Sequence, residues 1–237
     1  MYRARRLDAI ALFWALTVTI VAFPGFLEAN TTDMEANPQT GFLESVGLNQ
    51  QGYVVHTTDP GPLGKTTSVT ISTGVGLNPR LSISGSGNTS VVWTNSAGLV
   101  LYRKHDLMTR TWTGVESDAD GAVVGTAPGL VAGDLNSWVA YEEEDNGDRV
   151  VSSVEIIDSA EPWAKSPVAT VSGSQDLDLH VFQGEGAVWI VWDDSATQLA
   201  WSEKEVSGLW SIPGTMTYDP ANKAAGYLAI QDLVLDP

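Results

Sequence analysis

Two short acidic segments carry the side chains best suited to binding a metal ion. Residues 118–121 read Asp-Ala-Asp-Gly, and residues 145–148 read Asp-Asn-Gly-Asp. Carboxylate oxygens are hard ligands of the kind that Ca²⁺ prefers. Neither segment has the spacing of an EF-hand loop, and Asn-Gly is also typical of a tight hairpin turn whose acids are only solvated. Calcium is the one cofactor indicated, and its weak candidate ligands are Asp118, Asp120, Asp145 and Asp148.

No residue set in the chain identifies a reaction. His56, His105 and His180 are scattered and the chain has no Cys, so a zinc or copper site is not expected. A Gly-x-Ser-x-Gly elbow is absent as well. Carboxylates that could hydrolyse glycosides are abundant, but a general acid needs burial to raise its pKa. We assign no catalytic residue, and a non-enzymatic role is favoured.

The elements that would position these side chains follow from an internal repeat. The pattern Leu-x-(Ile/Val/Ala) recurs at residues 81–83, 130–132, 179–181 and 228–230, with its leucines 49 residues apart. A strand-like run ending in an aromatic residue follows in three of the repeats, and a third run and an isolated tryptophan come after it. The run-ending aromatics are Trp93, Tyr141 and Trp192, and the isolated tryptophans are Trp112, Trp163 and Trp210. Such periodic aromatics either pack between neighbouring units or stack on sugars.

Four short strands in each repeat predict an all-β fold of stacked four-stranded antiparallel blades, a β-propeller. We place blades at residues 79–127, 128–176 and 177–225, after an N-terminal extension at 30–47. A composite blade from residues 48–75 and 226–237 would close a ring of four. The alternative is a part of a larger propeller.

We letter the four strands of each blade A to D in chain order, from the inside outward. Acidic residues concentrate in the D-to-A and B-to-C connections, which emerge on one face of a propeller. We take this acidic loop face as the candidate binding surface. Its members are Glu116, Asp118, Asp120, Glu142, Glu143, Glu144, Asp145, Asp148, Asp176, Asp178, Asp193, Asp194 and Asp219. The opposite face receives the basic residues around His105, together with Lys204.

Residues 90–112 resemble one blade of the secreted sialidase-like propellers, the Asp-box or BNR-repeat superfamily. They read Ser-Val-Val-Trp-Thr-Asn, then Gly-Leu-Val-Leu-Tyr-Arg, then Asp106 and Thr-Trp. The box is degenerate, because Asp106 lies six residues before Trp112 with no Gly between them. Sialidase activity in that family relies on three arginines from different blades, whereas the arginines beyond residue 29 cluster mostly in one blade. The resemblance therefore implies the fold and a non-catalytic member.

Composition and the N-terminus indicate an exported protein. The chain carries 12 Lys and Arg against 29 Asp and Glu, a formal charge of −17, which excludes a basic nucleic-acid binder. Residues 1–29 read as a signal peptide, with three early arginines and an apolar run over 9–23 that is too short for the roughly 20 residues of a membrane span. We predict a secreted or periplasmic protein with no span after residue 29.

The predicted function is an exported, non-enzymatic binding or interaction module that uses the acidic loop face. Its partner would be a glycan or a protein. The alternatives are a glycan-active hydrolase or lyase on the propeller scaffold, and a truncated propeller fragment without a function of its own. A closed ring predicts a monomer, and an open one predicts self-association.

Overall fold

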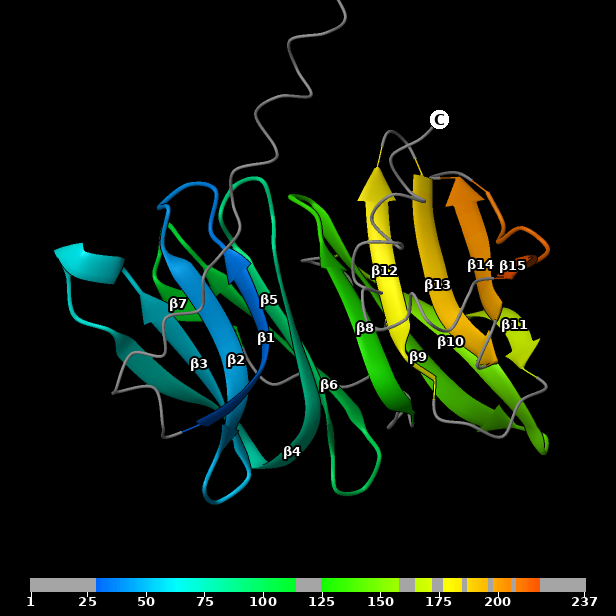
Figure 1. Cartoon of the computed structure of the whole chain (residues 1–237), viewed down its shortest axis with the longest axis horizontal. Helices are drawn as coiled ribbons and strands as arrows, with labels where there is room; N and C mark the ends of the chain where they lie inside the picture. Colours follow the sequence, from blue (N-terminus) through cyan, green and yellow to red (C-terminus); the bar gives the residue numbers. More distant parts are fainter. Residues whose placement is uncertain are drawn as a thin grey trace, which may run out of the picture.

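The computed structural model describes residues 29–113, 125–157, 165–171, 177–184, 187–195, 198–205 and 208–217. These residues form 15 strands and one 3-10 turn, η2, at Gly61–Leu63. Every strand pairing is antiparallel, as the sequence predicted. Because β4 is shared between two sheets, the strands make four sheets of four, which Figure 1 shows in sequence order from blue to orange.

The first seven strands form sheets 1 and 2. Their bounds are β1 (Ala29–Ala36), β2 (Leu43–Asn49), β3 (Tyr53–Asp59), β4 (Thr67–Ile83), β5 (Thr89–Asn95), β6 (Val100–Asp106) and β7 (Thr111–Trp112). Sheet 1 has the order β1-β2-β3-β4, and sheet 2 has the order β4-β5-β6-β7.

The remaining strands form sheets 3 and 4. Sheet 3 contains β8 (Thr126–Ala132), β9 (Asn136–Asp145), β10 (Asp148–Ile157) and β11 (Lys165–Val171). Sheet 4 contains β12 (Leu179–Gly184), β13 (Ala187–Ser195), β14 (Gln198–Glu205) and β15 (Gly214–Thr217). In both sheets the strands pair in chain order, so each sheet is a simple meander.

Strand β4 belongs to two sheets because it bends between them. Its residues up to Val75 pair with β3, and those from Gly76 onward pair with β5. Gly76 sits at this junction, where an added Cβ would lie 2.4 Å from Val54 and 3.0 Å from Trp93. A side chain would therefore force the two sheets apart, which explains the glycine at this position.

Three apolar cores hold the four sheets together, one between each consecutive pair. Trp93 packs into the core between sheets 1 and 2, Tyr141 into the core between sheets 2 and 3, and Trp192 into the core between sheets 3 and 4. All three rings are almost fully buried. The periodic aromatics at these positions thus pack between neighbouring sheets, which is one of the two interpretations that the sequence left open.

The inner strands touch in succession, β1 against β4, β4 against β8 and β8 against β12. Side chains of one inner strand bond to the backbone of the next. The Asp33 and Glu35 carboxylates accept hydrogen bonds from the backbone N–H groups of Leu81 and Ile83. Among the described strands, no contact of comparable extent joins β12 back to β1.

The N-terminal part of the fold differs from the sequence prediction. Residues 30–47, expected to be an extension, form β1 and most of β2 and complete sheet 1 together with β3 and β4. Sheet 1 therefore draws all four of its strands from residues 29–75 and does not need the C-terminal segment. That segment, residues 226–237, lies outside the described residues, as does the predicted signal peptide up to residue 28.

Candidate functional site

Two cross-strand pairs occupy the same position in sheets 2 and 4. His105 in β6 pairs with Trp112 in β7, and Lys204 in β14 forms an isolated bridge with Trp210. The two tryptophans are 98 residues apart, which is twice the sequence repeat of 49. Both indoles are partly exposed, and both face the preceding sheet.

The backbone around the two pairs is also the same. The N–H of Thr113 donates to the Lys104 carbonyl (2.8 Å), and the N–H of Ser211 donates to the Glu203 carbonyl (2.7 Å). In return, the hydroxyl oxygens of Thr113 and Ser211 accept from the N–H of Lys104 (2.9 Å) and of Glu203 (3.0 Å). A hydroxyl residue after the tryptophan thus locks this turn twice in the chain.

The preceding sheets contribute two further equivalent positions. Val46 pairs with His56 in sheet 1, and Ala140 pairs with Ser153 in sheet 3. Glu44 precedes Val46 by two positions, and Trp138 precedes Ala140 by two, so each lies on the same face of its strand as the residue two positions later. We name the two sets by their tryptophans, and they are listed here in equivalent order. The Trp112 site comprises Glu44, His56, His105 and Trp112, and the Trp210 site comprises Trp138, Ser153, Lys204 and Trp210.

Aromatic rings fill the Trp112 site. The Trp112 ring lies 5.1 Å from His56 in an edge-on contact and 5.2 Å from His105, measured between ring centroids. The two imidazoles are 6.4 Å apart and roughly parallel. Desolvation, followed by the positive potential of His56, lowers the pKa of His105. His105 is therefore held in its neutral form over more of the pH range than a solvated histidine.

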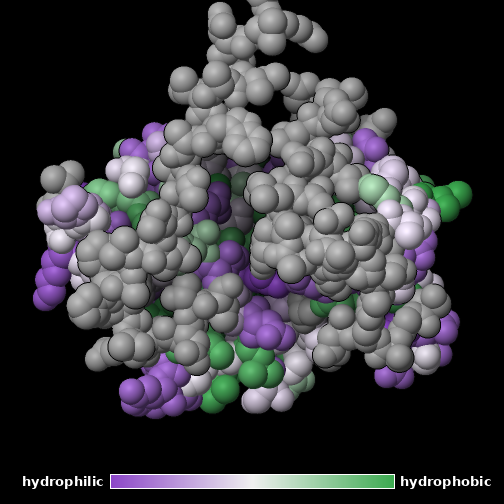
Figure 2. All heavy atoms as spheres, viewed as in Figure 1, coloured by the Kyte–Doolittle hydropathy of each residue, from purple (hydrophilic) through white to green (hydrophobic). Residues whose placement is uncertain are grey.

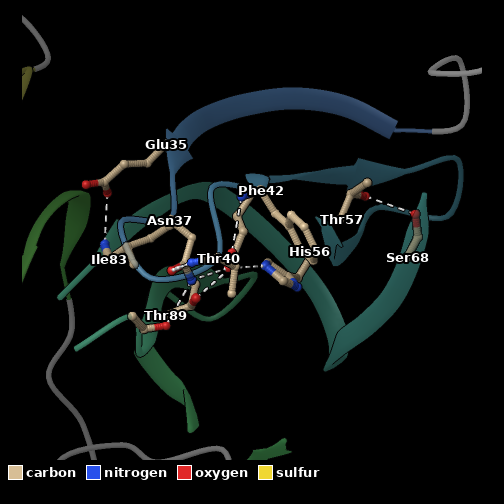
Figure 3. Close-up of polar contacts among 11 residues, drawn as sticks. Glu35, Asn37, Thr40, Phe42, His56, Thr57, Ser68, Ile83 and Thr89 are labelled. Atoms are coloured by element: carbon tan, nitrogen blue, oxygen red, sulfur yellow. Dashed lines mark hydrogen bonds and ion pairs between the residues drawn. The ribbon is translucent and has the colours of Figure 1, made fainter. Parts of the chain in front are cut away.

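Glu44 closes the buried end of the Trp112 site. One carboxylate oxygen accepts from Asn37 Nδ2 (2.6 Å), and the other contacts His56 Nε2 (2.9 Å) and accepts from the Thr89 hydroxyl (2.5 Å). Figure 3 shows the His56 ring pointing toward Asn37 and Thr89. Burial alone would raise the pKa of Glu44, but the hydrogen bonds from His56, Thr89 and Asn37 outweigh it and lower the pKa.

The Trp210 site has the same layout with different chemistry. Trp210 meets the buried Trp138 ring edge-on, with centroids 6.1 Å apart, and its Nε1–H donates to the Ser153 hydroxyl (3.0 Å). The Lys204 ammonium lies 4.7 Å from the Trp138 ring centroid and 5.7 Å from that of Trp210. An ammonium ion is thus held against two indoles where the Trp112 site has an imidazole.

The interface between sheets 2 and 3 holds a smaller polar cluster. The hydroxyls of Ser90, Tyr102 and Ser137 hydrogen-bond to one another at 2.8 to 3.2 Å. By register, Ile156 stands where the other sites have His105 and Lys204. The third isolated tryptophan, Trp163, lies outside the described residues.

Several acids of the predicted loop face lie on the β9–β10 hairpin, where they are partly neutralised. Glu142 pairs with Arg149, and Glu143 pairs with Lys165 while accepting from the Ser152 hydroxyl. Asn146 and Gly147 form the turn with positive φ angles of 55° and 90°. The flanking Asp145 and Asp148 pair across the hairpin and are exposed, together with Glu144. The segment thus forms the tight hairpin turn that Asn-Gly indicated in the sequence.

Other predicted residues are placed apart from this hairpin. Asp178 lies before β12 and pairs with Arg80 of β4 (2.7 Å) and with His180 (3.3 Å). A hydrogen bond from His180 is the main cause that lowers the pKa of Asp178. Asp193 and Asp194 are partly buried near the end of β13. The remaining candidates lie outside the described residues: Glu116, Asp118, Asp120, Asp176 and Asp219.

Within the described part of the chain, no group of three or more His, Asp or Glu side chains is arranged to hold a metal ion. Calcium stays a prediction at its four candidate ligands, Asp118, Asp120, Asp145 and Asp148, of which the first two lie outside the described residues. The same part of the chain contains no helix long and apolar enough to cross a membrane. In the face drawn in Figure 2, hydrophilic side chains dominate the described margins and hydrophobic ones form small separate patches.

Sequence reasoning found the tryptophans of the two sites but not their partners. Glu44 and His56 were not expected together, because 12 residues of sequence separate them and only the β2–β3 register brings them onto one face. The available signal was the 98-residue spacing of two tryptophans that are each followed by a hydroxyl residue. Both sites lie toward the A-to-B and C-to-D connections, at the opposite end of the sheets from the acidic hairpin.

No family model matches the chain, and no curated protein matches it. Several solved structures resemble the chain. The fucose-specific lectin of Aleuria aurantia has a TM-score of 0.58 at 17% identity, over 82% of this chain and 62% of the lectin. The fold is a β-propeller. The SapL1 lectin, in complex with a methyl fucoside, has a TM-score of 0.55 at 14% identity, over 80% of this chain and 64% of that one.

AofleA of Arthrobotrys oligospora has a TM-score of 0.57 at 14% identity, over 82% of this chain and 59% of that protein. The propeller spans about three fifths of the length of the lectins it matches, of which the Aleuria lectin is described as six-bladed. These comparisons support the propeller but neither a ring of four blades nor membership of the sialidase-like superfamily.

Proposed function

We propose that this propeller is a non-enzymatic carbohydrate-binding module whose sugars bind at the Trp112 and Trp210 sites. The observation that carries the proposal is the repetition of one arrangement. A partly exposed indole lies at a junction between sheets, on the same backbone turn, in two places 98 residues apart. Core packing alone does not require the exposed edge of either ring.

The chemistry of both sites suits a sugar. Ligand sites combine aromatic surface with a few fixed polar groups that orient the ligand. Trp112 and Trp210 supply the aromatic surface, and His105 and Lys204 supply the polar groups beside it. Strand residues supply every member of the two sites except Trp210, which lies between β14 and β15 and is held by its bridge to Lys204.

The solved relatives agree with this proposal. The Aleuria protein is a fucose-specific lectin, and the SapL1 lectin was solved with a methyl fucoside. At 17% identity and below, these relatives share only the fold with our chain, so its sugar is left open to experiment. We also propose that the protein acts after export, on the basis of the signal-like residues 1–29.

The test is a glycan array probed with the full chain, followed by calorimetry on the sugars that bind. We expect binding, with two sites per chain. Trp112→Ala and Trp210→Ala should each remove one site, because loss of a central aromatic contact typically weakens binding by about 10-fold or more. The double variant should not bind.

Trp189→Ala is the matched control. Trp189 is also partly exposed, but it alternates with the buried Val188 and Ile190 and so faces away from sheet 3. Its replacement should leave sugar binding unchanged. The proposal is overturned if no glycan binds, or if binding survives in the double variant with the fold intact by circular dichroism.

A further inference from the structure

Lys204 is a cation held against aromatic surface, with no anionic partner among the residues that the structure describes. Its ammonium lies over the rings of Trp138 and Trp210 and is partly exposed. None of the ion pairs among the described residues includes it. A cation in such a place is drawn out of water by the two rings and keeps donor capacity for a further group.

The Trp112 site differs in this respect. There the position of Trp138 is taken by Glu44, whose carboxylate already receives hydrogen bonds from Asn37, His56 and Thr89. The Trp112 site therefore contains its own buried anion. At the Trp210 site the equivalent position is an indole, and the positive charge of Lys204 is left for a ligand to meet.

The orientation of the Trp210 ring is fixed independently of any ligand. Its Nε1–H donates to Ser153, whose hydroxyl also donates to the Ser166 carbonyl (3.3 Å). The Trp210 indole is thus held in place beside the Lys204 ammonium. A sugar lying on the exposed part of Trp210 would place its ring substituents next to Lys204.

We propose that the Trp210 site selects an acidic sugar, with the Lys204 ammonium pairing with a carboxylate or sulfate while the Trp210 indole packs against the sugar ring. This inference rests on the proposed carbohydrate-binding function and adds the ligand class. The Trp112 site binds a neutral sugar, because it offers an imidazole and a carboxylate whose oxygens are already hydrogen-bonded.

Two negative features oppose an acidic ligand, and neither acts at contact distance on Lys204. The net charge of −17 repels anions, but over more than about 8 Å this repulsion is screened at physiological salt. Glu155 lies opposite Trp138 in the β9–β10 register, and its carboxylate accepts a hydrogen bond from Asn136. Removing the Glu155 charge should therefore strengthen the binding of an acidic sugar.

The experiment compares matched probes on the full chain by calorimetry. The pairs are methyl galactoside with methyl galacturonate, and methyl galactoside with its 6-sulfate, each at low and physiological salt. We expect the acidic probes to bind at least 10-fold more tightly than the neutral one at one of the two sites. Comparing carboxylate with sulfate shows which anion the site prefers.

Variants assign the effect to Lys204. Lys204→Gln should abolish the preference for acidic probes, Lys204→Arg should retain it, and Glu155→Gln should increase it. Lys65→Gln, which removes the same charge from an exposed loop, is the matched control and should leave the preference unchanged.

The outcomes separate the two proposals. If neutral glycans bind but acidic probes bind no better, or if Lys204→Gln keeps the preference, the acidic-sugar inference is wrong while the binding function stands. If no glycan of either kind binds, both are wrong. Thermal melting of each variant shows whether it is folded.

Discussion

The Thr89 hydroxyl in β5 donates a hydrogen bond to the Glu44 carboxylate in β2, across the junction between sheets 1 and 2. The same carboxylate contacts His56 and accepts from Asn37, and all four residues are buried. Both oxygens of this buried acid are hydrogen-bonded, so the network joins sheets 1 and 2 beside their apolar core.

Replacing Glu44 should destabilise the protein strongly. Glu44→Ala leaves the buried Asn37, His56 and Thr89 groups without their acceptor, and breaking a buried pair in this way typically costs about 3–5 kcal/mol. Urea unfolding should show this loss, whereas Glu144→Ala on the exposed hairpin should change the free energy of unfolding by less than about 0.5 kcal/mol. A change below about 1 kcal/mol for Glu44→Ala would contradict the network's structural role.

The network should also make stability depend on acid pH. Because the pKa of Glu44 is lowered in the folded state, its carboxylate stabilises the protein above the ordinary pKa of 4.5. That contribution is lost as the pH falls through the lower folded value. From pH 6 downward, the free energy of unfolding should fall more steeply with pH for the wild type than for Glu44→Gln. Equal slopes for the two proteins would refute the assignment.

Glu35 should act in the opposite direction. The pKa of Glu35 is raised to about 7, mainly because its carboxylate loses solvent where it lies against β4. The hydrogen bond from the Ile83 N–H lowers this pKa, and repulsion from Asp33 and Glu44 raises it further. Its protonated form therefore favours folding below pH 4.5, and this contribution is lost as the pH rises through about 7. Glu35→Gln should flatten the stability profile between these values. A carboxyl titration of Glu35 near pH 4.5 by NMR would contradict this.

A side chain at Gly147, in the hairpin turn, should destabilise the protein. Gly147 has a φ of +90° but open space around its Cβ position, so Gly147→Ala is strained by its backbone alone. We expect a loss of about 1 kcal/mol or more in urea unfolding. Gly74→Ala is the matched control, because Gly74 also has open space and no positive φ, and it should be neutral.

The exposed acids of the same hairpin should not contribute to sugar binding. Asp145 and Asp148 flank the turn at the opposite end of the sheets from the Trp112 and Trp210 sites. The double variant Asp145→Asn, Asp148→Asn should bind glycans with unchanged affinity, with or without added calcium. A loss of binding would return the function to the acidic loop face.

The sequence predicted the parts of the fold that depend on burial. Trp93, Tyr141 and Trp192 recur because each fills the same space against the preceding sheet. Their spacing predicted the repeat but left open whether they pack between sheets or stack on sugars. Strand β1 was missed because it does not read as an apolar strand. The carboxylates of Asp33 and Glu35 accept hydrogen bonds from the backbone of β4 and so hold β1 in place. Because these residues are acidic, the segment resembled a polar extension in the sequence.

The candidate sites could be predicted only in part, for a related reason. Each site takes residues from two sheets, and the pairing register decides which residues of neighbouring strands share a face. The cross-strand pairing of Lys204 with Trp210 and the position of Trp138 opposite them follow from that register. The tryptophan spacing marks where to look, but it does not reveal the ammonium beside the ring.

The continuous strand β4 has a mechanical consequence. It leaves sheet 1 and enters sheet 2 without a connecting loop, so the first two sheets have no hinge between them and must tilt together. The Trp112 site, which spans these two sheets, is thereby held at a constant width. A motion that opens one binding site but not the other would therefore have to occur in the sheets that follow sheet 2.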